Sequence, residues 1–272
     1  MSGQIIGLHD WFETPPGRYL LDWEQDQFDQ AVADVFGYHA LQLGLPEVQA
    51  LRANRMPHRW LALSESDMAP RSSLVTDFSA LPFPANSLDL VVLPHTLELS
   101  PDPHATLREV ERVLVPEGRV VICGLNPASL WGMRQRRARI YQRLGFGELF
   151  LPDAGEFIGY RRMRDWLRLL SFEVESGRFG IYRPAVRSEA WLERCHWFDS
   201  AGERWWPIFG AVYFLVAVKR VRGMRLLSAD WRRAAARASA PVPIAGRVHR
   251  EHRDHRDHVR RSPHRKKQGK GS

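Results

Sequence analysis

Residues 77–124 read DFSALPFPANSLDLVVLPHTLELSPDPHATLREVERVLVPEGRVVICG, and this stretch decides the fold class. Its apolar run at 88–93 predicts a strand buried on both faces, because it lacks the alternation of a half-solvated strand. Residues 103–114 predict a helix with proline in its first turn, and residues 119–123 predict a second strand. This order predicts an open parallel α/β sheet, which binds ligands at the carboxyl ends of its strands.

Elements on both sides extend this pattern. Apolar residues at helical spacing predict a helix over 22–36, whereas the Thr14-Pro15-Pro16-Gly17 cluster is expected to prevent an earlier one. Insertions at 126–158 and 183–207 are expected to cover the substrate side of the sheet. The other predicted strands are 38–43, 60–63, 74–77, 172–174 and 211–219, and the other predicted helices are 47–55 and 162–170.

Composition indicates a globular protein. The chain has 272 residues, 44% of them hydrophobic, which is enough for one substantial domain with its own core. Its two cysteines, Cys123 and Cys195, are far apart in sequence and lack the spacing of a metal site, which argues against a disulfide framework and predicts no metal site. The N-terminus does not resemble a secretory signal, and the longest apolar run, 207–218, is shorter than the ~20 residues of a membrane span. We therefore expect a cytoplasmic protein without a membrane span.

Charge separates the end of the chain from the rest. Residues 230–272 carry thirteen basic and four acidic residues, a balance of +9, whereas the whole chain carries +8. This tail contains few large apolar residues, so it is predicted to be disordered. Its basic charge predicts contact with nucleic acid without sequence preference. The predicted organisation is an N-terminal helical and turn-rich extension at 1–36, a main domain at 37–229 and the basic tail.

Five short motifs form a joint pattern: Asp77, Leu81-Pro82-Phe83, Leu88-Asp89-Leu90-Val91, Leu97-Glu98-Leu99 and Leu114-Val115-Pro116-Glu117-Gly118. This pattern resembles the class I S-adenosylmethionine-dependent methyltransferases, especially the type 11 branch that includes ubiquinone and menaquinone biosynthesis enzymes. The opening segment resembles an uncharacterised bacterial subfamily. The resemblance implies a doubly wound, mostly parallel seven-stranded sheet of Rossmann-like methyltransferase fold. It also implies S-adenosylmethionine as the cofactor and an unidentified methyl acceptor.

The resemblance assigns the adenine end of the cofactor to Asp77 and Phe78. In the family, the acid after the third strand meets the adenine amino group, and the next backbone N–H lies beside it. The competing interpretation is that Asp77 caps a turn, a common role for aspartate at a strand exit. An enzyme of this family is expected to have an open crevice near Gly44, Asp77 and Pro94, which makes Pro94 a further candidate cofactor contact.

The glycine-rich cofactor loop of the family is degenerate in this chain. The family has an acid and then Gly-x-Gly-x-Gly after the first strand, and this chain has Gln42-Leu43-Gly44-Leu45-Pro46-Glu47-Val48. Glycine permits a tight turn and close approach to a ligand, and proline has neither a free φ nor an N–H. Gln42 stands where the acid normally does. It is expected to form a hydrogen bond with the cofactor there, but it brings no charge for the ammonium group.

Two further positions have open alternatives. The acid that holds the ribose in the family corresponds to Ser64, or to Glu65 if the second strand ends one residue later. His95, just past the strand at 88–93, is the candidate general base for removing a proton from the acceptor, with Glu98 placed to orient it. The alternative is that His95 is a polar packing or capping residue.

Two functions therefore remain open. The first is a methyltransferase that acts on a small-molecule acceptor through a rebuilt cofactor loop. The second is a catalytically inactive binding or scaffold protein of the same fold, associated with RNA through its basic tail. Four tryptophans between 191 and 206 are expected to pack in the core under the insertions, or alternatively to line an apolar substrate pocket.

Overall fold

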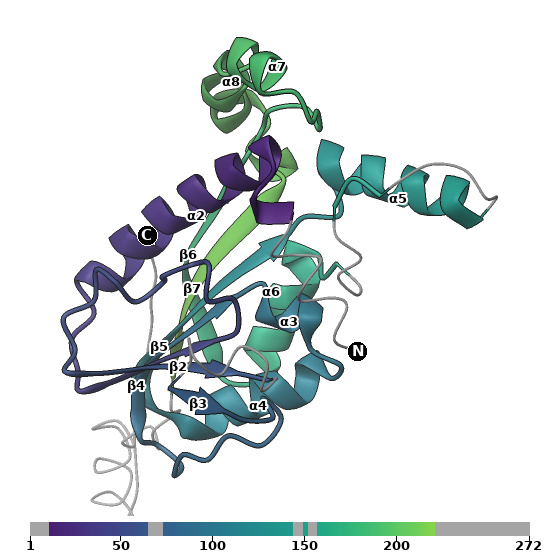
Figure 1. The fold of residues 1–272 in the computed structure, drawn as a ribbon. Coiled ribbons are helices and arrows are strands. Elements are labelled where there is room, and N and C mark those ends of the chain that lie inside the picture. The colour runs from purple at the N-terminus through teal and green to yellow at the C-terminus, as the bar shows by residue number, and fades with distance from the viewer. Residues whose placement is uncertain (1–10, 65–72, 144–148, 152–156, 221–272) are drawn as a thin grey trace, which may run out of the picture. The chain divides into compact units, whose positions relative to one another are not determined.

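The computed structural model describes residues 11–64, 73–143, 149–151 and 157–220, whose helices and strands are shown in Figure 1. Seven strands form one sheet in the order β3-β2-β1-β4-β5-β7-β6. The strands are β1 (His39–Leu43), β2 (His58–Leu63), β3 (Leu74–Val75), β4 (Leu88–Pro94), β5 (Leu114–Leu125), β6 (Phe172–Gly180) and β7 (Val212–Lys219). The predicted seven-stranded sheet is confirmed.

Most neighbouring strands run parallel. β1 pairs in parallel with β2 and with β4, β2 with β3, and β4 with β5. β7 pairs antiparallel with β5 on one side and with β6 on the other. The chain runs outward from β1 to β3 and then returns to β4 on the other side of β1. The strand order reverses between β1 and β4, so the carboxyl ends of these two strands form the topological switch point, where open α/β sheets bind ligands.

Three long helices cover the two faces of the sheet: α2 (Pro15–Ala33), α4 (Pro103–Val113) and α6 (Tyr160–Leu169). Successive residues of β4 point to opposite faces. Leu90 and Val92 belong to the buried cluster that includes residues of α2, whereas Val91 and Leu93 belong to the cluster of α4 and α6. Both faces are thus apolar, which is why the run at 88–93 shows no alternation.

Helix α2 begins earlier than expected. Thr14 is its N-cap, and the Thr14 Oγ1 atom accepts a hydrogen bond of 3.3 Å from the backbone N–H of Gly17. Pro15 stands in the first turn, where the missing N–H of proline costs no helical hydrogen bond. The prediction that this cluster prevents a helix is therefore wrong, because threonine followed by proline starts one here.

Replacing Thr14 by alanine is expected to lower the free energy of unfolding by about 1 kcal/mol, since the first turn loses its side-chain acceptor. Urea denaturation followed by circular dichroism measures this loss. Thr14→Ser keeps the hydroxyl group and is the matched control, which should retain most of the stability. Equal losses in both variants would show that the methyl group of Thr14, and not its cap, is what stabilises α2.

The connection between β1 and β2 contains turns where a helix was predicted at 47–55. Buried side-chain amides bind backbone groups in this connection. Gln42 donates to the carbonyl oxygen of Val48 and accepts from the N–H of Ala50, both within the predicted helix. Asn54 Nδ2 ties the connection to the end of α2 through the carbonyl oxygen of Val32 at 2.8 Å. Such bonds compete with helical hydrogen bonding. The helix prediction is wrong for this reason.

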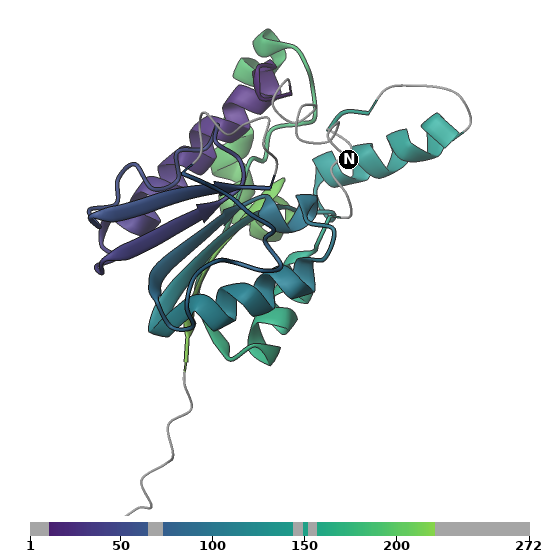
Figure 2. The same ribbon diagram turned by 60° about the horizontal axis from the view of Figure 1, so that its bottom comes forward.

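Both insertions lie at the carboxyl edge of the parallel strands. β5 ends at Leu125, which pairs with Val212 at the start of β7. Residues on either side of this pair therefore enter or leave the sheet at that edge, and α5 extends away from the sheet there in Figures 1 and 2. The helices of these segments are α5 (Leu130–Arg143), α7 (Glu189–Arg194), α8 (Trp197–Trp205) and the 3-10 helix η2 (Pro207–Phe209).

The tryptophans of the second insertion are on the surface. Between 54% and 71% of each side chain is exposed in Trp191, Trp197, Trp205 and Trp206. The prediction that they pack in the core is wrong, because α7 and α8 bury smaller residues instead, Leu192 and Gly202.

Several expectations concern residues that the structure does not describe. The basic tail at 230–272 and Glu65 lie outside the described residues. Helix α2 shares a buried cluster with the sheet. The predicted boundary at residue 36, between the N-terminal extension and the main domain, stays a prediction. Within the described part of the chain, no helix combines the length and apolar character needed to cross a bilayer.

Candidate functional site

Three segments that are far apart in sequence meet at the switch point. Gly44 follows β1 and has a φ of +76°, in the left-handed region that favours glycine. A Cβ built on Gly44 would lie 3.5 Å from Thr96 Oγ1 and 3.9 Å from Phe78 Cε2. Thr96 begins α3 (Thr96–Leu99) and donates to the carbonyl oxygen of Leu43. Residues after β1, β3 and β4 therefore lie against one another here. Gly44 and Phe78 are half-buried, whereas Thr96 and Pro94, the last residue of β4, are buried beneath them.

Asp77 is exposed at the exit of β3. Its Oδ1 atom accepts hydrogen bonds from the backbone N–H and the hydroxyl of Ser79, both at 2.8 Å. These two bonds lower the pKa of Asp77, so the group is a carboxylate at neutral pH. The turn-capping role is thus present in the structure. The cofactor role stays a prediction, and an exposed carboxylate beside Phe78 is compatible with it.

Gln42 is buried and holds the loop after β1. Its Nε2 atom donates to the carbonyl oxygens of Val48 at 2.6 Å, Leu45 at 2.9 Å and Gly44 at 3.2 Å. Its Oε1 atom accepts from the N–H of Ala50 at 3.1 Å. Both ends of the amide are therefore bonded inside the protein. Gln42 shapes the loop from within, and a direct contact between its side chain and the cofactor stays a prediction.

The loop turns without the second and third glycines of the family pattern. Gly44 and Leu45 both have positive φ angles, +76° and +39°, and together they reverse the chain. The side chains of Leu45 and Val48 then lie in the core, with 3% and 0% of their surface exposed. Of the two residues that stand in place of glycine, Val48 faces the interior and Pro46 is half-buried. Gln42 binds the carbonyl oxygen of Val48 from within.

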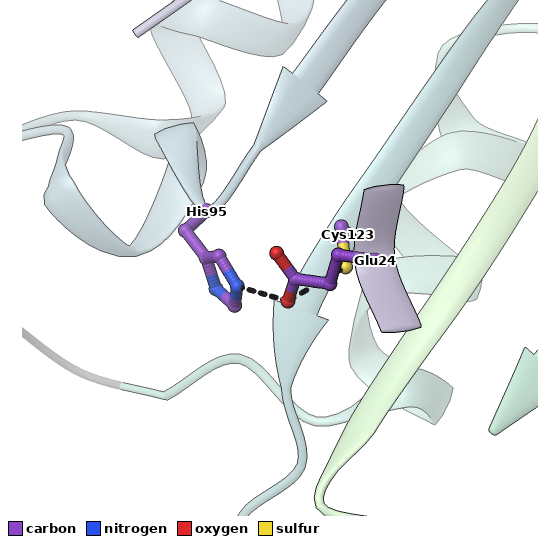
Figure 3. Close-up of side chains that lie close together, drawn as sticks. All are labelled: Glu24, His95 and Cys123. Atoms are coloured by element: carbon purple, nitrogen blue, oxygen red, sulfur yellow. Dashed lines mark hydrogen bonds and ion pairs between the residues drawn. The ribbon is translucent and has the colours of Figure 1, made fainter. Parts of the chain in front are cut away.

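His95 lies in a buried network of four side chains. Its Nε2 atom is 2.6 Å from Glu24 Oε1, and its Nδ1 atom is 2.9 Å from Glu98 Oε2. The other carboxylate oxygen of Glu98 accepts from the backbone N–H of Leu125 at 2.6 Å. Cys123 Sγ donates to Glu24 Oε1 at 3.4 Å (Figure 3). The network joins α2 to the ends of β4 and β5.

The two carboxylates determine the charge of His95. Burial by itself would lower the pKa of His95, but Glu24 and Glu98 outweigh it and raise the pKa to about 10. Burial raises the pKa of the Cys123 thiol well above its usual value, so that group stays protonated. An imidazolium that donates from both nitrogens has no lone pair for a substrate proton. This geometry favours the packing alternative for His95, and its role as general base stays a prediction.

The sequence contains a signal that Glu24 is buried. Buried residues of α2 recur at helical spacing as Leu20, Glu24, Phe28 and Val32. An acid within an apolar stripe indicates a buried charge with a partner elsewhere in the fold. Sequence spacing predicts neither a disulfide nor a metal site at Cys123. Its place next to Val121 and Leu125 on the α2 face of β5 becomes evident only from the sheet.

The remaining candidates are not brought together with these three segments by any described contact. Ser64 is exposed after β2, and its neighbour Glu65 lies outside the described residues. A cavity of about 710 Å³ lies elsewhere, between α6 and β6, and includes Tyr160 and Arg168 in its lining. The open crevice near Gly44 stays a prediction.

Comparisons with known proteins agree with this geometry. Residues 51–122 match a family described as a methyltransferase domain. The chain is 30% identical over 218 residues to the uncharacterised protein YafS of Escherichia coli, and the match covers 79% of this chain and 82% of YafS. It is 30% identical over 117 residues to demethylmenaquinone methyltransferase of Anoxybacillus flavithermus, a match that covers 38% of this chain and 49% of that enzyme.

A solved structure shows the same fold. A methyltransferase of Thermotoga maritima, described as S-adenosylmethionine-dependent and as a possible histamine N-methyltransferase, superposes with a TM-score of 0.52 at 16% identity. The match covers 78% of this chain and 94% of that one. Sheet order, motif pattern and sequence identity all point to one assignment: the chain belongs to the family of YafS, within the class I S-adenosylmethionine-dependent methyltransferase superfamily.

Proposed function

We propose that this chain binds S-adenosylmethionine and transfers its methyl group to a small-molecule acceptor. The observation that carries the proposal is the meeting of three segments at the switch point, where Gly44 lies against Phe78 and Thr96, and Asp77, the neighbour of Phe78, exposes its carboxylate. Doubly wound sheets bind their ligands at this place. When bound, S-adenosylmethionine supplies an electrophilic methyl group, and the protein contributes mainly by positioning the acceptor.

The residues at the adenine end fit the cofactor. The carboxylate of Asp77 is exposed and ionised, so it can accept a hydrogen bond from an exocyclic amino group. The ring of Phe78 approaches the left-handed backbone at Gly44, which itself carries no side chain. We propose that Asp77 and Phe78 contact the adenine end of the cofactor and that Gly44 and Pro94 contact the part next to it.

The residues at the amino-acid end fit less well. Gln42 carries no charge, and its amide is engaged by the loop. We therefore propose that Gln42 contributes by holding the backbone of the loop in place, rather than by pairing with the ammonium group. We propose Glu65 as the ribose contact, with Ser64 as its alternative.

Replacing Asp77 by alanine is expected to weaken binding of S-adenosylmethionine by roughly 10- to 100-fold, the usual effect of losing a hydrogen bond to a charged group. Calorimetric titration with S-adenosylmethionine and S-adenosylhomocysteine measures this change. Ser79→Ala is the matched control, because it removes one of the two bonds that Asp77 accepts and leaves the carboxylate in place.

The control separates the two roles of Asp77. If Ser79→Ala weakens binding as much as Asp77→Ala does, Asp77 acts through the turn and not through the ligand. No heat from a folded wild-type protein would contradict the proposed function and favour an inactive protein of this fold, acting as a binding or scaffold module.

We also propose that the protein works in the cytoplasm and that residues 230–272 contact nucleic acid without sequence preference. The support for this contact is the excess of basic residues in the tail. Binding of this kind weakens steeply as salt rises, and it is independent of methyl transfer.

A further inference from the structure

We propose that Glu24, His95 and Cys123 form a binding site for a transition-metal ion such as Zn²⁺, beneath helix α2. The potential ligand atoms of these residues all lie within 4.8 Å of one another, and the three side chains are buried. Figure 3 shows them converging from α2, the end of β4 and β5. Imidazole, thiolate and carboxylate are the ligands that Zn²⁺ takes in proteins. The site does not depend on S-adenosylmethionine binding.

The second carboxylate oxygen of Glu24 provides an independent indication. Glu24 Oε2 is fully buried and has no hydrogen-bond partner among the described residues. A buried carboxylate oxygen without a partner is costly. A cation bound by both oxygens of Glu24, by His95 Nε2 and by Cys123 Sγ would have four donor atoms and would give this oxygen a partner.

Glu98 does not contact the proposed ion but holds one of its ligands, His95, in place. It accepts the hydrogen bond of His95 Nδ1 at 2.9 Å, which directs Nε2 of the ring toward Glu24 and Cys123. The backbone N–H of Leu125 fixes Glu98 in turn. Carboxylates that hold the second nitrogen of a metal-binding histidine in this way are a regular part of zinc sites.

The geometry requires only a small adjustment. Zn²⁺ bonds of about 2.0–2.3 Å place nitrogen and oxygen ligands roughly 3.3 Å apart in a tetrahedron, so the 2.6 Å contact of His95 Nε2 with Glu24 Oε1 must lengthen by less than about 1 Å. Cys123 Sγ and Glu24 Oε1 are already 3.4 Å apart. On binding, Sγ and Nε2 each release a proton to solvent and bond to the ion through the freed lone pair.

The test uses the full chain, stripped of metal with a chelator and titrated with Co²⁺ and with Zn²⁺. Cobalt bound by thiolate gives a sulfur-to-metal charge-transfer band, which histidines elsewhere in the chain cannot produce because they lack sulfur. We expect this band to develop in the wild-type protein and in Cys195→Ser, and to be absent in Cys123→Ser. Cys195 is the matched control, since it is the second cysteine of the chain and lies outside the cluster.

A second variant keeps the proposal testable if Cys123→Ser does not fold. Glu98→Gln leaves all four donor atoms in place, and it should weaken Co²⁺ binding by roughly 10- to 100-fold, as loss of an outer carboxylate does in other sites. A folded wild-type protein without the charge-transfer band would overturn the proposal. So would a band that survives in Cys123→Ser or an unchanged affinity in Glu98→Gln.

Discussion

Replacing Gln42 by glutamate is expected to destabilise the fold by roughly 3–5 kcal/mol, although glutamate is an acid of the kind that related enzymes carry at this position. The amide nitrogen of Gln42 donates to three backbone carbonyl groups. A carboxylate cannot donate to them, and each buried polar group left without a partner costs about 1–3 kcal/mol. Restoring the family residue should therefore damage the loop instead of repairing it.

Guanidinium denaturation of Gln42→Glu measures this loss of stability. Gln49→Glu is the matched control, because Gln49 lies in the same loop with an exposed side chain and undergoes the same change of charge. We expect the control to stay within about 0.5 kcal/mol of the wild type, as surface substitutions usually do. Equal stability of the two variants would contradict the role that we assign to Gln42.

Replacing His95 by leucine is expected to destabilise the metal-free protein by roughly 3–5 kcal/mol, the usual cost of removing one partner from a buried ion pair. Glu24 and Glu98 are 0% and 4% exposed, and both bond to His95. Without the imidazolium, two buried carboxylates face one another without a compensating charge. Guanidinium denaturation again provides the measurement.

Two further variants separate the charge network from packing. His196→Leu changes an exposed histidine in the same way and should have little effect. The double variant His95→Leu, Glu24→Leu removes one of the two stranded carboxylates, so it should be more stable than His95→Leu alone. If the double variant is instead the less stable one, the contribution of His95 is packing and not charge.

The strands of this fold could be predicted because local pattern decides them. The apolar runs at 88–93 and 119–123 lie within β4 and β5. Strands buried on both faces need apolar side chains at nearly every position, and Asp89 and Arg119 are the charged exceptions. The antiparallel pairing of β7 with β5 and β6 could not be read from the residues in this way, because no local feature of residues 211–219 specifies the direction of a neighbour.

The connection after β1 and the buried network could not be predicted, because both depend on contacts between distant residues. The pattern at 47–55 is compatible with a helix. Whether a helix forms depends on the bonds of Gln42 to Val48 and Ala50 and on the bond of Asn54 to helix α2. Glu24 and His95 are 71 residues apart in the chain. No motif of the family links these two positions, so only the folded chain shows that one neutralises the other.

We propose that the loop held by Gln42 provides one side of the cofactor site. The most direct measurement is a ¹H–¹⁵N correlation spectrum of the protein during titration with S-adenosylhomocysteine. We predict saturable shifts centred on the amides of Gly44, Leu45, Asp77 and Phe78. Shifts confined to other surfaces, or an unchanged spectrum at saturating ligand, would contradict the claim.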